Sequence, residues 1–185
     1  MEKDVPQAAR TLLESNVKDE IKHDLALGFI VESHGADPIA EMEAIRLRDA
    51  WIQHPDHTIL KALVAERAIF FVLLPMFRFL GDAALRTVSA DISRDEQIHV
   101  ATNSLVCREL GLVPSNSLDK LRKATISWVL QPLKTSPDKH LDKSFWLDAS
   151  DRLMYEGKAP QFADTKAARM PAFFEHANTN LPQYA

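Results

Sequence analysis

The sequence predicts an all-α helical bundle, and two observations carry that prediction. Apolar residues recur at steps of three and four along most of the chain, which is the spacing of one face of an α-helix. Only 5 of the 185 residues are glycine, and no segment sustains the strict apolar–polar alternation of a half-buried strand. A chain of this length can bury a hydrophobic core of its own.

Short segments rich in glycine, proline and aspartate divide the chain into six expected helices. Pro6 suits the first turn of the opening helix, because a backbone N–H is not needed there. Pro75 lies inside the third helix and predicts a kink, because its ring clashes with the carbonyl of Phe71. The expected helices span residues 7–33, 38–53, 57–80, 83–111, 117–132 and 139–157.

Helical periodicity ends near residue 157. We therefore expect one helical bundle over residues 1–157, followed by an extended C-terminal tail over residues 158–185 that packs across the surface. The sequence contains no repeat of the kind that builds a solenoid, so a single bundle is the expected architecture.

The composition excludes several classes of protein. The chain carries 22 Lys and Arg against 26 Asp and Glu, a net charge of −4, so we expect no nucleic-acid partner. The apolar run over residues 68–77 is too short to span a bilayer as a helix, and no leader-like segment opens the chain. Cys107 is the single cysteine, which indicates a reducing, cytoplasmic location.

A glutamate interrupts the apolar face of the opening helix. Glu20 lies on a stripe of apolar residues at helical spacing, and His23 follows it by about one turn. The apolar members of this stripe are Leu13, Val17, Leu27 and Val31.

The fourth expected helix, which contains ADISRDEQIHVATNSLVCREL, repeats this arrangement. Glu96 and His99 are again three residues apart, and they lie on or beside the apolar face. The apolar positions of this helix are Ile92, Ile98, Val106 and Leu110.

The third expected helix is apolar nearly all round, and Glu66 lies in its middle. A helix of this composition is buried. A buried carboxylate is very costly unless it is paired, protonated or bound to a metal.

Three glutamates on the apolar faces of three helices indicate that all three serve one site. Glu-x-x-His on two helices, with an inward glutamate on another, is most of the ligand pattern of di-metal carboxylate bundles. Carboxylate oxygens can bridge two cations, and neutral imidazole suits iron and manganese. Residues i and i+3 share a helix face, so each pair presents an oxygen and a nitrogen together. The predicted metal ligands are Glu20, His23, Glu66, Glu96 and His99.

A buried ion-pair network is the alternative that requires no metal. In that case Arg67 and Arg94 would neutralise Glu66 and Glu96. The other histidines lie near helix breaks or in polar segments, and we expect them on the surface: His34, His54, His57, His140 and His176.

The segment ISRDEQIH, residues 92–99, closely resembles the Arg-Asp-Glu-x-x-His signature of the ribonucleotide reductase small subunit. ERAIFFVLLPMF resembles a ligand helix of that family, and DEIKHDLAL is similar to its first Glu-x-x-His helix. The terminal MPAFFEHANTNLPQYA resembles the tyrosine-containing end of many small subunits. The resemblance runs from about residue 6 to the end, and it implies a ferritin-like helical bundle.

The resemblance also implies a role for each matching residue. Glu20 and His23 would bind one metal ion, and Glu66, Glu96 and His99 would complete the site or bridge to the other ion.

Four further residues acquire roles around that site. Asp95 would hydrogen-bond a ligand histidine and fix its tautomer, and Arg94, from the same motif, would lie beside the site. Phe70 would line the apolar side through which oxygen enters. Leu27 occupies the position at which the family carries its radical tyrosine.

This chain departs from the family pattern in two ways. The family has another carboxylate-bearing helix before its first Glu-x-x-His, and nineteen residues precede Glu20 here. The sixth ligand is therefore expected to be missing, or to come from another chain, a water or a residue such as Glu14. The two tyrosines, Tyr155 and Tyr184, do not match the radical position, so we expect no stable tyrosyl radical.

The implied function is that of a reductase small subunit. Two metal ions, iron or manganese with iron, would react with oxygen to give an oxidising equivalent. A large subunit, docked through the tail around Tyr184, would use that equivalent to reduce ribonucleotides to deoxyribonucleotides. An apolar groove left by the missing helix predicts a homodimer.

Two alternatives remain open. The first is a ferritin-like di-metal oxygenase or oxidase that acts without a large subunit, which a substrate-sized cavity beside Leu27 would favour. The second is a degenerate or partial chain with weak or no metal binding.

Overall fold

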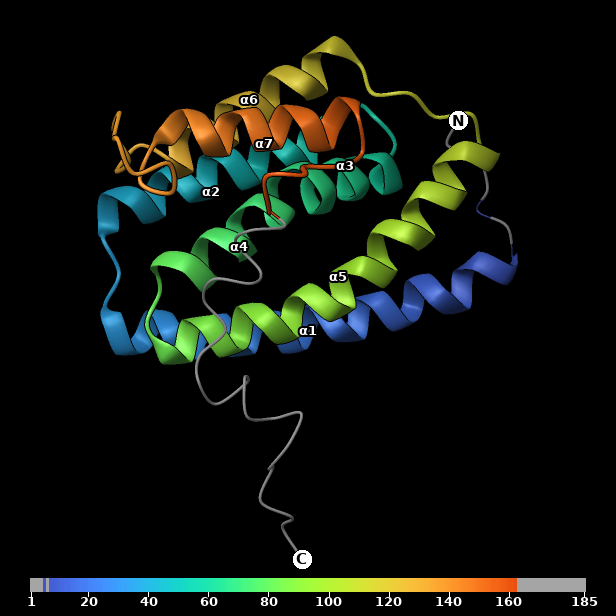
Figure 1. The fold of residues 1–185 in the computed structure, drawn as a ribbon. Coiled ribbons are helices and arrows are strands. Elements are labelled where there is room, and N and C mark those ends of the chain that lie inside the picture. The colour runs from blue at the N-terminus through green and yellow to red at the C-terminus, as the bar shows by residue number, and fades with distance from the viewer. Residues whose placement is uncertain (1–4, 6, 163–185) are drawn as a thin grey trace, which may run out of the picture.

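The computed structural model describes residue 5 and residues 7–162, and it confirms the predicted all-α helical bundle (Figure 1). All six expected helices are present in this part of the chain, and the third is divided by a π-helical segment, η1. The elements are α1 (Gln7–His34), α2 (Pro38–Gln53), α3 (Thr58–Ala65), η1 (Glu66–Phe70), α4 (Phe71–Leu80), α5 (Ala83–Glu109), α6 (Asn116–Val129) and α7 (Lys143–Tyr155).

Some of the predictions fall on residues outside this description. They include Pro6, His176 and most of the expected C-terminal tail, with Tyr184. The first residues of the tail are described, and Phe162 among them is buried against Trp146 of α7.

The helices are arranged in layers (Figure 1). α1 and α5 lie side by side and run in opposite directions along one side of the bundle. The continuous α3–η1–α4 helix packs against α5, and α7 covers η1 and α4 from the opposite side. α2 packs against α6. Within the described residues, every helix is too short or too polar to cross a lipid bilayer.

Two apolar clusters hold these layers together. The first joins α3, α5 and α6 and contains Leu63, Val106 and Leu118. The second joins η1, α4, α6 and α7 and contains Val72 and Trp146. Leu118 and Val72 are fully buried, and each side chain of this kind contributes on the order of 1.5–3 kcal/mol.

Asp82 caps α5 and contacts the end of α1. Its carboxylate accepts a hydrogen bond of 2.8 Å from the backbone N–H of Leu85, which caps the first turn of α5. The same carboxylate lies 3.2 Å from Nε2 of His34 in the last turn of α1. The end of one helix is thereby joined to the start of the other.

The π-helical segment has an origin in the sequence. Leu60, Val64, Ala68 and Val72 recur every four residues, and none is more than 3% exposed. Because an α-helix has 3.6 residues per turn, a row of this spacing would rotate by about 40° at each step. A π-turn accommodates the extra residue, and here the N–H of Phe71 reaches the carbonyl of Glu66 five residues earlier.

The π-segment is an irregularity that the sequence analysis did not predict. Pro75 lies inside α4, as expected, and because it has no N–H it cannot donate a hydrogen bond to the carbonyl of Phe71. Ser150 connects the π-segment to α7 and α6. The hydroxyl of Ser150 on α7 donates to the carbonyl of Ala68 at 2.6 Å and accepts from Nη1 of Arg122 on α6 at 2.6 Å.

Several predictions of burial were wrong. Val17, Val31 and Ile98 are 51–61% exposed, because α1 packs mainly against α5 and only a narrow stripe of each helix lies between them. His140, expected on the surface, is buried. The centroid of its ring lies 3.8 Å from that of Phe79. The segment between α6 and α7 folds back, so the His140 ring also contacts Phe145 and Trp146.

Replacing Ser150 should destabilise the π-segment. In Ser150→Ala the buried carbonyl of Ala68 loses its donor and Arg122 loses an acceptor, so we expect the free energy of unfolding to fall by about 1–3 kcal/mol. Urea unfolding followed by circular dichroism measures this. The control is Ser104→Ala at a half-buried position on α5, which should change the free energy by no more than about 0.5 kcal/mol. Equal effects of the two substitutions would contradict the role given to Ser150.

Candidate metal centre

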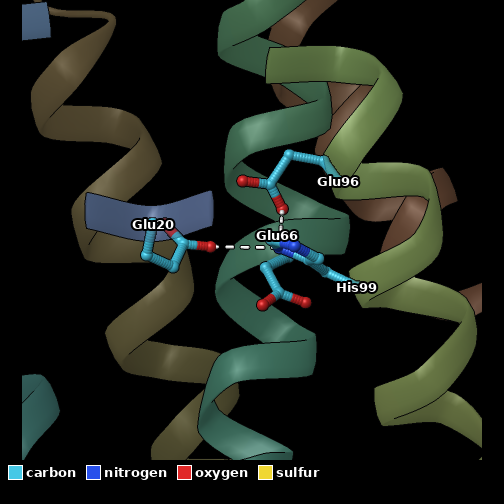
Figure 2. A group of neighbouring side chains, drawn as sticks. All are labelled: Glu20, Glu66, Glu96 and His99. Carbon is cyan, nitrogen blue, oxygen red and sulfur yellow. Dashed lines mark hydrogen bonds and ion pairs between the residues drawn. The ribbon is translucent and has the colours of Figure 1, made fainter. Parts of the chain in front are cut away.

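Four of the five predicted ligands converge at the centre of the bundle (Figure 2). Glu20 comes from α1, Glu66 from the first residue of the π-segment, and Glu96 and His99 from α5. One ligand atom from each lies within 4.8 Å of the others. Glu66, Glu96 and His99 are buried and Glu20 is partly buried. The structure thus contains a group of side chains that could hold a metal ion.

His23, the fifth predicted ligand, borders this group. Its Nδ1 lies 3.5 Å from Oε1 of Glu96 and 3.6 Å from Oε2 of Glu20. The side chain is buried, and its ring centroid is 6.0 Å from that of His99. Both histidines therefore lie against the carboxylates.

Asp95 makes the hydrogen bond that the family resemblance implied for it. Oδ2 of Asp95 lies 3.0 Å from Nε2 of His23. A proton on Nε2 leaves Nδ1 of the neutral ring with a lone pair, which is directed at Glu20 and Glu96. Two carboxylates cannot face a lone pair at this distance without repulsion, so a proton or a metal ion must lie between them.

His99 is placed in a similar way. Its Nδ1 lies 3.1 Å from Oε1 of Glu20 and 3.5 Å from Oε2 of Glu96. Its Nε2 faces Oδ2 of Asp19 at 3.6 Å, beyond direct hydrogen-bond distance. Lys22 hydrogen-bonds Asp19 at 2.8 Å and lowers the pKa of that carboxyl, which keeps it charged.

Asp19 was missed in the sequence, although a signal was present. The pentapeptides DEIKH, residues 19–23, and DEQIH, residues 95–99, share the pattern Asp-Glu-x-x-His. Because α1 and α5 are antiparallel, the aspartate of each segment faces the histidine of the other.

Asn103 was also missed. It lies four residues after His99, one helical turn further along the same face of α5. Its side-chain amide donates a hydrogen bond of 2.8 Å to Oε2 of Glu66. Asn103 therefore fixes the orientation of Glu66.

Burial makes the ionised carboxylates costly. Burial raises the pKa of Glu66 to about 7, although the hydrogen bond from Asn103 opposes the change. Burial, and then the neighbouring charges of Glu20 and Glu66, raise the pKa of Glu96 to about 8. A cation placed between these side chains would favour their charged forms.

The arginines do not supply that cation. Arg67 donates to the backbone carbonyl of Met154 at 3.1 Å. Arg94 pairs with Asp91 on the surface and is 70% exposed. Among the described residues, no lysine or arginine forms an ion pair with the three glutamates of the cluster. The ion-pair alternative thus lacks its partners, and Arg94 is not beside the site as expected, since two residues before Glu96 is the far side of α5.

The donor set fits iron or manganese. Three buried atoms of the cluster have no hydrogen-bond partner within the described part of the chain: Nδ1 of His23, Oε2 of Glu96 and Nε2 of His99. Carboxylate oxygens and imidazole nitrogens are ligands that both metals accept. Glu14, considered as a sixth ligand, is exposed on α1 and is not part of the group.

Leu27 and Phe70 lie beside the cluster. They line a cavity of about 370 Å³ whose wall also includes Glu20, His23 and Glu96. No tyrosine is among the lining residues that the structure describes. Tyr155, at the end of α7, is 62% exposed and donates a hydrogen bond to Asp119 at 2.7 Å.

No protein-family model matches this chain, and no curated protein or solved structure matches it. Its function is therefore inferred from the geometry of the cluster.

The metal-free protein should lose stability as the pH rises from about 5 to 8. The pKa values of Glu66 and Glu96 are about 7 and about 8 in the folded protein, against 4.5 ordinarily. Between these values the folded state binds more protons than the unfolded state, so the free energy of unfolding falls with rising pH. Urea unfolding in the presence of a chelator, at several pH values, measures this slope.

Glu96→Gln should flatten the slope, because glutamine does not titrate. The control is Glu14→Gln at the exposed position on α1, which should keep the slope of the unsubstituted chain. Parallel pH profiles for the unsubstituted chain and Glu96→Gln would show that Glu96 does not titrate as described.

Proposed function

We propose that this chain is a di-metal oxidoreductase in which two metal ions, iron or manganese with iron, are bound at the centre of the helical bundle. Glu20, His23, Glu66, Glu96 and His99 would hold the ions. One observation carries the proposal: three glutamates and two histidines converge in the core, and no described lysine or arginine is paired with those glutamates.

Iron or manganese, when bound, would supply one-electron redox chemistry with dioxygen. The chain's own residues orient and shield the site. Asp95 directs Nδ1 of His23 toward the carboxylates, and Asn103 holds Glu66 in place. Leu27 and Phe70 give one side of the site an apolar lining, which strengthens electrostatic interactions there by limiting water.

The first candidate reaction is that of a ribonucleotide reductase small subunit. The motif at residues 92–99 supports it, as does the contact between Asp95 and His23 that the resemblance implied. In that case the oxidising equivalent would serve a large subunit that docks on the C-terminal tail, and the chain would be a homodimer. Exposed apolar side chains on the outer face of α1 support a homodimer: Val17, Ile21, Leu25 and Phe29.

The second candidate is a ferritin-like oxygenase or oxidase that acts on a small substrate without a large subunit. The cavity beside Leu27 favours this candidate, because it adjoins three of the five ligand residues. In either case the same metal centre would perform the oxidation.

Metal binding should depend on Glu66. We expect about two iron or manganese ions per chain in freshly purified protein, and Glu66→Ala should retain almost none, because it removes a ligand from the middle of the cluster. Elemental analysis by mass spectrometry gives the metal content per chain. The control Glu14→Ala, at the exposed position on α1, should retain the metal.

Glu66→Leu provides a second test of the same site. It should also lose the metal, yet stabilise the metal-free fold at a pH where Glu66 would be charged, because it removes a buried carboxylate from an apolar helix. An unchanged metal content in both Glu66 variants would refute the proposed centre.

No stable tyrosyl radical should form. The position that the resemblance assigns to a radical tyrosine is Leu27, and Tyr155 is exposed and bonded to Asp119. We expect electron paramagnetic resonance to show no long-lived tyrosyl signal after loading with ferrous iron, or with manganese and iron, and exposure to air. A stoichiometric, long-lived tyrosyl signal would show that the first helix is assigned in the wrong register.

A further inference from the structure

The cavity beside the cluster has two chemically different walls. α1, the α3–η1–α4 helix and α5 together line a partly open cavity of about 370 Å³. Glu20, His23 and Glu96 form one wall, so the cavity reaches the proposed metal ligands directly. Apart from Asp24, the rest of the lining is apolar and is formed by Leu27, Phe70, Leu73, Leu74, Phe77 and Ile92.

The size of the cavity limits what it can hold. Small-molecule sites usually enclose about 300–1,000 Å³ and combine apolar walls with a few polar groups. This cavity lies at the lower end of that range. It suits one short molecule, such as an alkyl chain of moderate length or a one- or two-ring aromatic compound.

The charges around the cavity limit the ligand further. Asp24, an exposed residue of α1, joins Glu20 and Glu96 in its lining. No lysine or arginine is among the described lining residues. In the metal-free chain an anionic ligand would approach the carboxylates of Glu20 and Asp24 with no cationic side chain beside it, and the apolar wall provides no partner for a charged group.

We propose that this cavity binds an uncharged, largely apolar small molecule, with one end against Glu20, His23 and Glu96. The inference rests on the proposed di-metal function and deepens it, since such a molecule is the class of substrate that the centre would oxidise.

Leu27 offers a way to test the cavity by substitution. It lies on α1 four residues after His23, and its side chain lines the cavity. A larger side chain at this position would fill the space. Leu25, two residues away on the same helix, is 61% exposed on the outer face, so the two positions form a matched pair.

The first experiment measures binding of the uncharged dye Prodan to the full-length, metal-free chain by its fluorescence. n-Decanol and decanoate are the competitors, because they share a chain length and differ in charge. We expect n-decanol to displace the dye and decanoate to bind about tenfold more weakly or worse, which corresponds to about 1.4 kcal/mol. Equal displacement by the two compounds would overturn the proposed preference for an uncharged ligand.

The second experiment fills the cavity. Leu27→Trp should weaken dye binding about tenfold or more, whereas Leu25→Trp should leave it within about twofold. Unchanged binding in a folded Leu27→Trp variant would overturn the proposal, because the dye would then be bound elsewhere, for example on the exposed apolar face of α1.

A third variant keeps the proposal testable if Leu27→Trp does not fold. Leu73→Ala enlarges the cavity, so the preference should move from n-decanol toward n-dodecanol. The same preference as in the unsubstituted chain would count against the cavity as the binding site.

Metal content separates the two hypotheses. Elemental analysis of metal-loaded samples of the same variants should show that Leu27→Trp retains its metal. If the unsubstituted chain binds metal and not the uncharged ligands, the cavity proposal fails alone. If it binds those ligands and not metal, the proposed di-metal function fails and the cavity remains a binding site.

Discussion

The central constraint on this fold is the burial of Glu66 and Glu96 beside the partly buried Glu20, where α1, the π-segment and α5 meet (Figure 2). No described lysine or arginine pairs with them, and burial raises the pKa values of Glu66 and Glu96. The apolar cluster that contains Trp146, on the α7 side of the bundle, contributes stability that offsets the cost of burying these carboxylates. An apolar core could have filled the same space at lower cost, and the proposed metal centre gives a reason for the polar cluster.

The two Asp-Glu-x-x-His segments give this cluster an approximate twofold symmetry. Because α1 and α5 are antiparallel, they present the same motif to each other in opposite directions. The glutamate of each motif points into the cluster, and the aspartate of each motif faces the histidine of the other motif. The symmetry is imperfect. Asp95 is within hydrogen-bond distance of His23, whereas Asp19 is 3.6 Å from His99 and is also bonded to Lys22. The two histidines are therefore held with unequal strength.

Local periodicity was enough to predict the helices and to mark Glu66 as buried, because both depend on residues close together in the chain. Features that depend on how helices meet were not predictable. The π-segment depends partly on Ser150, far away on α7, and the role of Asp19 depends on the register of α1 against α5. His140 looked like a surface residue because nothing near it in sequence shows that its loop folds onto Phe79.

The polar character of the contact between α1 and α5 has a consequence for how the chain folds. Apart from a few apolar contacts near its start, α1 is joined to α5 by polar pairs, at His23, Glu20 and His34. Helices held in this way open locally at low free-energy cost. An ion bound by Glu20 and by residues of α5 would disfavour this local separation of α1 from α5. The ion would bind only when the two helices are together, so its binding free energy would add to the stability of the folded state. Docking of α1 and capture of the ion would then be a single thermodynamic event.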